Sequence, residues 1–425
     1  MPTKSPTRWP KPFALLIACA LSLNVHAQPW EHAAVAADHE LASQAGVEIL
    51  QQGGNVVDAT VATGFALSVL RPGSAGLGGG GFMVIWNAEK GEAVALDFRE
   101  RAPEKATRDL FTKPRSDGTI PSSEHGGSAI AVPGQVAGLC HALTHYGTMT
   151  LAQVLAPALR YAEEGVPLDR HEIDGRTALA KNFAQDTGLQ TRYAILWEQY
   201  LLKGAIDPTT RYPSPQAPAL RALAELGPAA FYEGAIAQAL VACIQTHDGI
   251  LSTADLATMD VVPRTPITTQ ISGSQVFSFP PPSSGGIALE ETFNILNAFI
   301  FCQTGAPLRS LGHNSPEYLH LLTESMKYAF ADRGTYLGDA DFHEVPVARL
   351  TSSAHAEKIA AHLDIRNTQP PEHYGAAMAP NDAGTTHYSV IDKAGNAVAC
   401  TETINTAFGS WVVEPQYPAT SPSPA

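Results

Sequence analysis

The chain has 425 residues, of which 44% are hydrophobic and 16% are charged. This balance is typical of a globular protein, and the length is sufficient for one large domain or two ordinary ones. The formal net charge is −14, whereas proteins that bind nucleic acids usually concentrate Lys and Arg to release phosphate counterions. We therefore expect small-molecule chemistry and no nucleic-acid partner.

The N-terminal residues have the pattern of a secretion signal. Basic residues precede an apolar run at 13–23, and small residues within 25–27 suit a signal peptidase. The run is too short to span a bilayer. We expect residues 1–27 to be a signal peptide and the mature protein to be periplasmic or secreted, without a membrane span. The stretch "LIAC", ending at Cys19, offers lipoprotein processing as the less favoured alternative.

Cysteine and histidine spacing gives no sign of a metal centre. The cysteines that follow the signal are widely spaced and form no C-x-x-C pair: Cys140, Cys243, Cys302 and Cys400. Neither a dense disulfide framework nor a zinc ribbon fits this spacing. His141 and His145 share a helical face, but no H-E-x-x-H motif occurs. We therefore expect no metal site.

The first elements after the signal are two helices and a hairpin. A helix capped by Asp38 and ended by Gly53-Gly54 precedes a second helix at 56–70. Strands are then expected at "FMVIW" (82–86) and "AVALDFRE" (93–100). Two helices packed on a hairpin would form one pair of layers.

A glycine loop lies between the second helix and the first strand. Gly76, Gly78 and Gly81 match G-x-G-x-x-G. A dinucleotide-binding fingerprint needs a strand before the loop and a helix after it, and this order is reversed here. Two interpretations stay open: a tight loop with close backbone approach, or a substrate-facing loop lined by backbone amides.

Arg99 lies at the end of the second strand, flanked by Asp97, Glu100 and Arg101. Such a cluster can be a set of surface ion pairs. A guanidinium at a strand end can also clamp a substrate carboxylate through two parallel hydrogen bonds. The residues alone do not separate these alternatives.

The middle of the chain is mainly helical, and the end has a polar tail. Strands are expected at "TPITTQI" (265–271) and "SQVFSFP" (274–280), followed by helices at 287–301 and 315–339. No internal repeat occurs. Residues 418–425, "PATSPSPA", are expected to be disordered.

A second hairpin begins near Thr385 in "NDAGTTHYSV" and turns at "KAGN". In the plain interpretation Thr385 only starts a strand. In the other, the peptide bond before Thr385 is cut, and the residue then carries both a nucleophilic hydroxyl and a basic α-amine. Thr403 and Asn405 would share a strand face with Thr385. That face is either solvated, or Thr403 bonds the nucleophile while Asn405 receives a polar group of the substrate.

Seven ordered blocks of sequence carry a family resemblance. They are "AADHELASQAGVEILQQGGNVVDATVAT", "GLGGGGFMV", "DFRERAP", "AVPGQVAGL", "PPPSSGG", "YAFADRGTYLGD" and "TTHYSVIDKAGNAVACTETINTAFGS". Together, from about Ala33 to about Glu414, they resemble the γ-glutamyltransferases, also called glutathione hydrolases.

The resemblance implies an α+β fold, the αββα sandwich of the N-terminal-nucleophile hydrolases. The precursor would cut itself between Gly384 and Thr385, leaving a large-subunit region at 28–384 and the start of a small subunit at 385–417. Thr385 would then attack γ-glutamyl amides such as glutathione. The γ-glutamyl group would pass to water, amino acids or peptides, with no metal or organic cofactor.

The resemblance also implies a role for each candidate residue. Arg99 would hold the substrate α-carboxylate, Asn405 the α-amino side, and Thr403 would orient Thr385. The family's small subunit continues beyond the last shared block with further substrate-binding and oxyanion groups. We therefore expect a C-terminally truncated member with an incomplete sandwich, poor turnover and inefficient self-processing.

Two other functions remain in view. A β-lactam acylase of the same fold would share the self-cut threonine but take another acyl group. Arg99 in "DFRERAP" favours γ-glutamyl substrates, because a carboxylate clamp has little use on an apolar acyl chain. The other candidate is a non-catalytic secreted fragment, which would bind small amino-acid ligands or nothing.

Overall fold

The computed structural model describes residues 32–271, 273–304, 308–375 and 384–418. The expected signal peptide at 1–27, with Cys19, lies outside these residues, as does the expected disordered tail apart from Pro418. Pro418 is buried, and its carbonyl accepts a hydrogen bond from the Tyr200 hydroxyl at 3.3 Å. None of the helices in the described ranges is long and apolar enough to cross a membrane.

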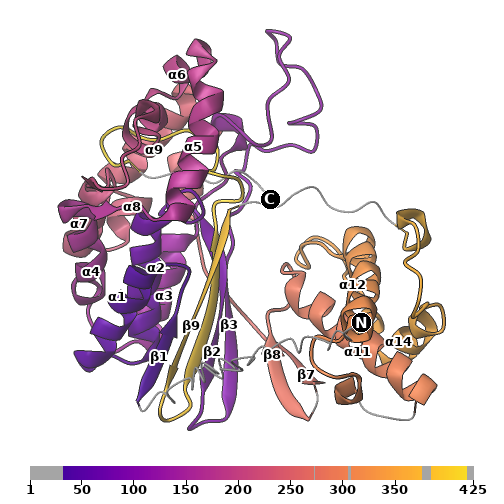
Figure 1. Ribbon diagram of the computed structural model, residues 1–425. Helices are drawn as coiled ribbons and strands as arrows, with labels where there is room; N and C mark the ends of the chain where they lie inside the picture. The colour runs from indigo at the N-terminus through magenta and orange to yellow at the C-terminus, as the bar shows by residue number, and fades with distance from the viewer. Residues whose placement is uncertain (1–31, 272, 305–307, 376–383, 419–425) are drawn as a thin grey trace, which may run out of the picture.

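A six-stranded antiparallel sheet forms the centre of the molecule, with strand order β1-β9-β10-β2-β3-β6 (Figure 1). The strands are β1 (Ala33–Ala36), β2 (Gly80–Asn87), β3 (Glu92–Phe98), β6 (Val262–Arg264), β9 (Thr385–Asp392) and β10 (Ala397–Thr403). Both expected hairpins, β2–β3 and β9–β10, are confirmed. The hairpin from the end of the chain lies between β1 and β2, so it is held on both sides by earlier segments.

Helices α1 (Glu40–Gln51), α2 (Val56–Leu70) and α3 (Gln135–Tyr146) form a layer against one face of this sheet. Every residue of α2 is buried. This burial explains why α2 reads as an almost continuous apolar run rather than an amphipathic one. Alternate residues of the central hairpin, such as Tyr388 and Cys400, pack against the helices.

The start of α1 differs from the sequence expectation. His39, and not Asp38, caps the helix, because its Nδ1 accepts a hydrogen bond from the Leu41 amide at 3.1 Å. Burial lowers the pKa of His39 and so favours the neutral ring that can accept this bond. The Asp38 carboxylate instead binds Nε of Arg71, at 3.1 Å.

Further helices extend the layer beyond α3 and α2. They are α4 (Leu151–Glu164), α5 (Arg170–Ala184), α6 (Thr187–Arg192), α7 (Ala217–Leu226), α8 (Ala229–Tyr232), α9 (Ala235–Thr246) and α10 (Thr253–Ala257). A small ribbon pairs β4 (Val166–Pro167) with β5 (Arg211–Tyr212). Single helical turns lie at Gly127–Ala129, Leu196–Tyr200, Leu202–Gly204, Leu308–Leu311 and Pro371–His373.

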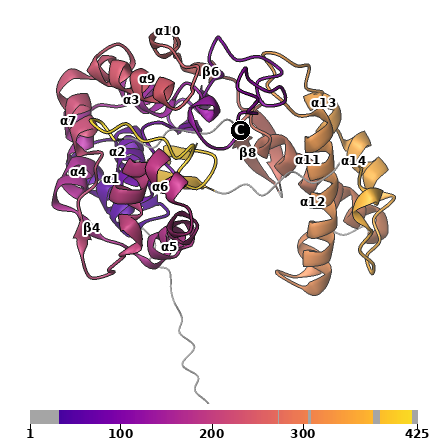
Figure 2. The same ribbon diagram turned by 90° about the horizontal axis from the view of Figure 1, so that it is seen from above.

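A second lobe packs around its own small core (Figures 1 and 2). It contains β7 (Ile267–Ile271), β8 (Ser274–Ser278), α11 (Gly285–Thr304), α12 (Pro316–Tyr336), α13 (Val347–Leu350) and α14 (Ser353–Ala360). The β7–β8 ribbon meets the sheet face opposite the helical layer. The ring centres of Phe277, in β8, and Trp86 are 4.9 Å apart. Just after β8, the ring centres of Phe279 and Phe82 are 4.4 Å apart. The expected α+β class is confirmed.

Candidate active site

One end of the six-stranded sheet brings the expected site residues together. Thr385 opposes Thr403 across β9 and β10, and Thr403 in turn opposes Gly80 at the start of β2. The β2–β3 register places Arg99 directly after β3 at the same edge. Opposed residues of antiparallel strands share a face. Thr385 and Thr403 therefore share a face of the sheet, as the sequence predicted, and this face points away from the helices.

The Thr403 hydroxyl is the centre of a short hydrogen-bond chain. It accepts a hydrogen bond from the Thr385 hydroxyl at 3.1 Å and donates one to the Gly384 carbonyl at 2.9 Å. It also accepts from the Asn405 amide at 2.8 Å. A hydroxyl has one donor and two acceptor sites, so all are used. This arrangement orients the Thr385 oxygen and polarises the carbonyl of the Gly384–Thr385 bond.

Gly384 is suited to this position by its conformation. Its φ angle is +110°, a region that side chains with a Cβ rarely adopt. A Cβ here would also come within 3.1 Å of the Thr406 carbonyl. A larger residue at 384 would therefore shift the carbonyl that Thr403 holds.

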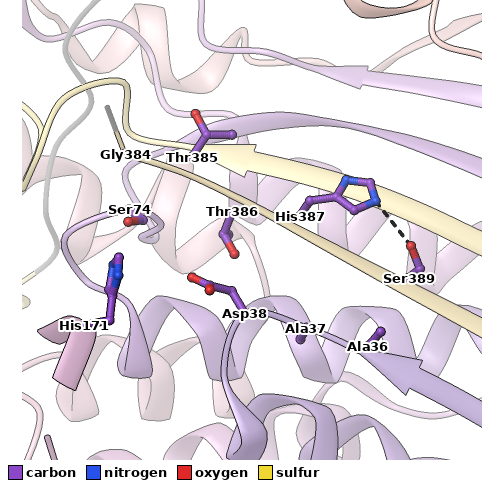
Figure 3. A pocket seen from close by; sticks show the side chains of 10 residues that line it. All are labelled: Ala36, Ala37, Asp38, Ser74, His171, Gly384, Thr385, Thr386, His387 and Ser389. Atoms are coloured by element: carbon purple, nitrogen blue, oxygen red, sulfur yellow. Dashed lines mark hydrogen bonds between the residues drawn. The ribbon is translucent and has the colours of Figure 1, made fainter. Parts of the chain in front are cut away.

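A pocket of about 560 Å³ lies beside Thr385, on the β1 side of β9 (Figure 3). Its lining comes from separate parts of the sequence: Ala36, Ala37, Asp38, Ser74, His171, Gly384, Thr385, Thr386, His387 and Ser389. The lining is mixed, with polar side chains such as Asp38 and His171 beside apolar surface, and it leaves room for water or a small molecule next to the Gly384–Thr385 bond. Arg99, Thr403 and Asn405 are not part of its wall.

Arg99 lies at the same end of the sheet, next to β3 rather than next to the pocket, and makes an ion pair there. Its Nε lies 3.1 Å from Oε1 of Glu100, and its side chain is 28% exposed. The Glu100 side chain is only 2% exposed. Burial raises the pKa of the Glu100 carboxyl, and the Arg99 charge lowers it in part. The Asp97 carboxylate accepts a hydrogen bond from the Arg99 backbone amide at 3.0 Å and pairs with Arg264 at 2.7 Å.

Asn405 differs from its expected place on a strand face. Strand β10 ends at Thr403, and Asn405 has a φ angle of +72°. The chain leaves the ladder here because the Thr406 amide bonds back to the Ile404 carbonyl at 3.1 Å. Asn405 is therefore the central residue of a tight turn, and its backbone amide, through the bond to Thr403, joins the site.

The glycine loop allows close backbone contacts at the same edge. A Cβ on Gly79 would lie 2.4 Å from the Thr403 carbonyl, and a Cβ on Gly81 would lie 2.4 Å from that of Thr401. Real Cβ atoms do not approach so closely, so strand β10 can lie here only against glycine. Of the two interpretations left open by the sequence, these contacts favour close backbone approach.

Comparisons with known proteins agree with this architecture. The family model described as gamma-glutamyltranspeptidase matches residues 42–417. The chain belongs to the gamma-glutamyltranspeptidase family. It is 41% identical over 383 residues to the glutathione hydrolase proenzyme of Escherichia coli, a match that covers 89% of this chain and 64% of the relative. The chain thus spans less than two thirds of that relative's length.

Solved structures of this family are also similar. The gamma-glutamyltranspeptidase from Pseudomonas nitroreducens complexed with L-DON matches with a TM-score of 0.70 and 32% identity, over 80% of this chain and 97% of that one. The cephalosporin acylase from Bacillus halodurans matches with a TM-score of 0.78 and 28% identity, over 92% and 69%. The expected N-terminal-nucleophile hydrolase fold is confirmed. The residues that the structure describes form two layers of the sandwich of that fold, a helical layer and the six-stranded sheet.

A buried carboxyl lies under the site of this gamma-glutamyltranspeptidase-family chain, and sequence reasoning missed it. Glu402 precedes Thr403 and faces the helices, with 1% exposure. It accepts hydrogen bonds of 2.8 Å from the Tyr388 hydroxyl and the Gln135 amide. The strand alternation would have placed residue 402 on the buried face, and a charged residue there was the available signal.

Glu402→Gln should change how stability depends on pH. Burial raises the pKa of Glu402 from 4.5 to about 7, although its two hydrogen bonds oppose the shift. The folded state thus holds a proton that the unfolded chain releases near pH 4.5. The stability linked to this proton is complete below pH 4.5 and is lost as pH rises through 7. Between pH 5 and 8, the free energy of unfolding should fall in the wild type relative to Glu402→Gln by roughly 2 to 3 kcal/mol.

Denaturant unfolding at several pH values measures this difference. Glu225→Gln is the matched control, because Glu225 is exposed on α7. Parallel pH profiles for wild type and Glu402→Gln would contradict the prediction.

Proposed function

We propose that this chain is a threonine-nucleophile enzyme that cuts itself and then hydrolyses or transfers γ-glutamyl groups, with glutathione as a substrate. The observation that carries the proposal is the contact of the Thr403 hydroxyl with both the Thr385 hydroxyl and the Gly384 carbonyl. The relatives named glutathione hydrolase proenzyme support both the self-cleavage and the substrate class.

Self-cleavage begins with attack of the Thr385 oxygen on the Gly384 carbonyl carbon. The Thr385 nitrogen leaves and takes a proton, so the peptide bond becomes an ester. Water then hydrolyses the ester, which leaves a carboxylate on Gly384 and a free α-amine on Thr385. The pocket beside this bond gives water access.

Turnover uses the same hydroxyl. The freed α-amine, with an ordinary pKa of roughly 7.7 to 8.0, removes the hydroxyl proton near neutral pH. The oxygen attacks the γ-glutamyl amide, the amine leaves with a proton, and an acyl-enzyme forms. Water releases glutamate, whereas an amino acid or peptide amine forms a new γ-glutamyl compound.

The proposed subunits would stay together after the cut. The large-subunit region at 28–384 contains β1 and β2, and the region from 385 to 417 contains β9 and β10. The pairs β1–β9 and β10–β2 cross between the two regions. Backbone ladders on both sides would therefore hold the fragments without a covalent link.

In this proposal Arg99 binds the α-carboxylate of the glutamyl group and Asn405 its α-amino side. The side chain of Arg99 remains 28% exposed, and its contact with Glu100 is made through Nε. The other nitrogens can form the parallel pair of hydrogen bonds that a carboxylate accepts.

Arg99→Lys should leave self-cleavage intact and weaken substrate binding. A point charge replaces a planar fork, so one charge-assisted hydrogen bond of about 1.5 to 3 kcal/mol is lost, which corresponds to a rise of roughly 10- to 100-fold in KM. Steady-state kinetics with a γ-glutamyl anilide and a denaturing gel measure the two effects. Blocked self-cleavage, or an unchanged KM in the cut enzyme, would refute the assigned role.

The acylase alternative is tested by comparing two anilide substrates that differ only in their acyl group. Relatives named Acylase ACY 1 proenzyme are 36% identical over 90% of this chain. A γ-glutamyl anilide should be hydrolysed, whereas a butyryl anilide, which lacks the α-amino and α-carboxylate groups, should not. Equal turnover of both anilides would favour an acylase, and turnover of neither would favour a non-catalytic chain.

We also propose that residues 1–27 direct secretion to the periplasm or the medium. The basic start, the apolar run and the small residues before Gln28 support this. Sequencing the N-terminus of exported protein should begin at Gln28. A lipid-modified Cys19 would show that the lipoprotein alternative holds.

A further inference from the structure

Three potential metal ligands meet in the second lobe, which is separate from the six-stranded sheet that carries Thr385. Nε2 of His355 on α14 lies 3.1 Å from Oε1 of Glu291 on α11 and 2.8 Å from Oδ2 of Asp332 on α12. One ligand atom from each residue lies within 4.8 Å of the other two. Figure 2 shows these three helices together on the side of the molecule away from α1 and α4.

We infer that Glu291, Asp332 and His355 form a binding site for one divalent transition-metal ion, such as Zn²⁺. Zinc binds nitrogen and carboxylate oxygen at about 2.0 to 2.2 Å, and tetrahedral geometry places neighbouring ligands roughly 3.4 Å apart. The two separations in the structure, 3.1 and 2.8 Å, are somewhat shorter, so small side-chain rotations would open the cluster around an ion. A mixed nitrogen and oxygen set suits zinc better than magnesium or calcium, which prefer oxygen alone.

The geometry brings one imidazole nitrogen to both carboxylates. The imidazole Nε2 carries at most one proton, yet it faces an oxygen of each carboxylate. The Glu291 side chain is 1% exposed, so its carboxyl depends on partners within the protein. A metal ion would bind both carboxylates and the neutral imidazole at once.

The charges favour a cation in the same place. Two carboxylates carry two negative charges, which a divalent ion offsets. Side-chain exposures of 21% for Asp332 and 13% for His355 leave one side open for entry and for water ligands.

The ion would stabilise the lobe. One small core cluster of the lobe contains Ile295, Ala356 and Ile359. Ile295 lies one turn along α11 from Glu291, and Ala356 follows His355. Small cores gain much from a metal that joins their elements. The proposed ion would connect α11, α12 and α14 beside this cluster.

Zinc titration of the full chain, stripped with a chelator, tests the inference. We expect one tight site by calorimetry in competition with a chelator. Its affinity should fall at least 100-fold in Glu291→Gln and in Asp332→Asn. His362→Gln is the control, because His362 is an exposed histidine just beyond α14, and it should bind zinc as the wild type does. Zinc should raise Tm in the wild type and in the control only.

Two results would overturn the inference. One is the absence of a tight zinc site in the wild type. The other is an unchanged affinity in Glu291→Gln and Asp332→Asn, which would assign the binding to other histidines. Circular dichroism of both variants confirms folding, and either variant alone decides the question if the other does not fold. If a shared proton rather than a cation holds the cluster, zinc will not change the Tm of the wild type.

Discussion

Thr385→Ala should abolish both self-cleavage and γ-glutamyl hydrolysis, because one hydroxyl serves both reactions. In the structure this hydroxyl donates to Thr403, which in turn binds the Gly384 carbonyl. Alanine keeps the strand and the backbone but removes the nucleophile. The protein should run on a denaturing gel as a single uncut chain, with release of anilide from the γ-glutamyl substrate at the background rate.

Thr385→Ser is the matched variant, because it keeps the hydroxyl and loses only a methyl group. It should still cut itself and turn over substrate, at a reduced rate. All variants are expressed from the complete gene. Cleavage of Thr385→Ala at the same bond would refute the proposed nucleophile. Intact chains of wild type and Thr385→Ser would refute self-cleavage altogether.

The sequence predicted the local parts of the site well. The period-two pattern after Gly384 predicts the β9–β10 hairpin, and a normal hairpin register places Thr385 opposite Thr403. Arg99 was correctly placed at the end of a strand. These inferences succeed because strand alternation and hairpin register are set by residues close together in the sequence.

Features that depend on distant segments could not be predicted. Glu402 is satisfied by Gln135, 267 residues away, so its buried pairing needs knowledge of how α3 packs on the sheet. The pocket beside Thr385 combines Asp38, Ser74 and His171 from the first half of the chain. Asp38 was assigned to a helix cap because its partner, Arg71, lies 33 residues later.

Asn405 and the cluster of Glu291, Asp332 and His355 in the second lobe show two other limits of prediction from sequence. Whether a residue after a strand adopts a positive φ depends on the turn that contains it. Asparagine is tolerated at such positions, but it is not a strong signal for them. Glu291 and His355 are separated by 64 residues, so no short ligand motif marks them. Only the packing of α11, α12 and α14 brings them together.

Thr403→Val should slow both self-cleavage and turnover by roughly 100- to 1,000-fold, the range seen when one donor to a reacting oxygen is removed. Valine has nearly the shape of threonine and suits a strand, so the β10 backbone should persist. What is lost is the bond to the Gly384 carbonyl and the acceptor for the Thr385 hydroxyl.

Two further variants separate chemistry from structure. Thr403→Ser keeps the hydroxyl and should retain most of the cleavage rate. Thr401→Val makes the same change two residues away on the same strand face, where the hydroxyl contacts His387 at 2.8 Å, and should leave cleavage within a few-fold of wild type. The rate comes from the fraction of cut chain over time on a gel, with Tm measured for each variant. Rapid cleavage of Thr403→Val, or equal slowing in Thr401→Val at matched Tm, would show that Thr403 acts only through the packing of the strand.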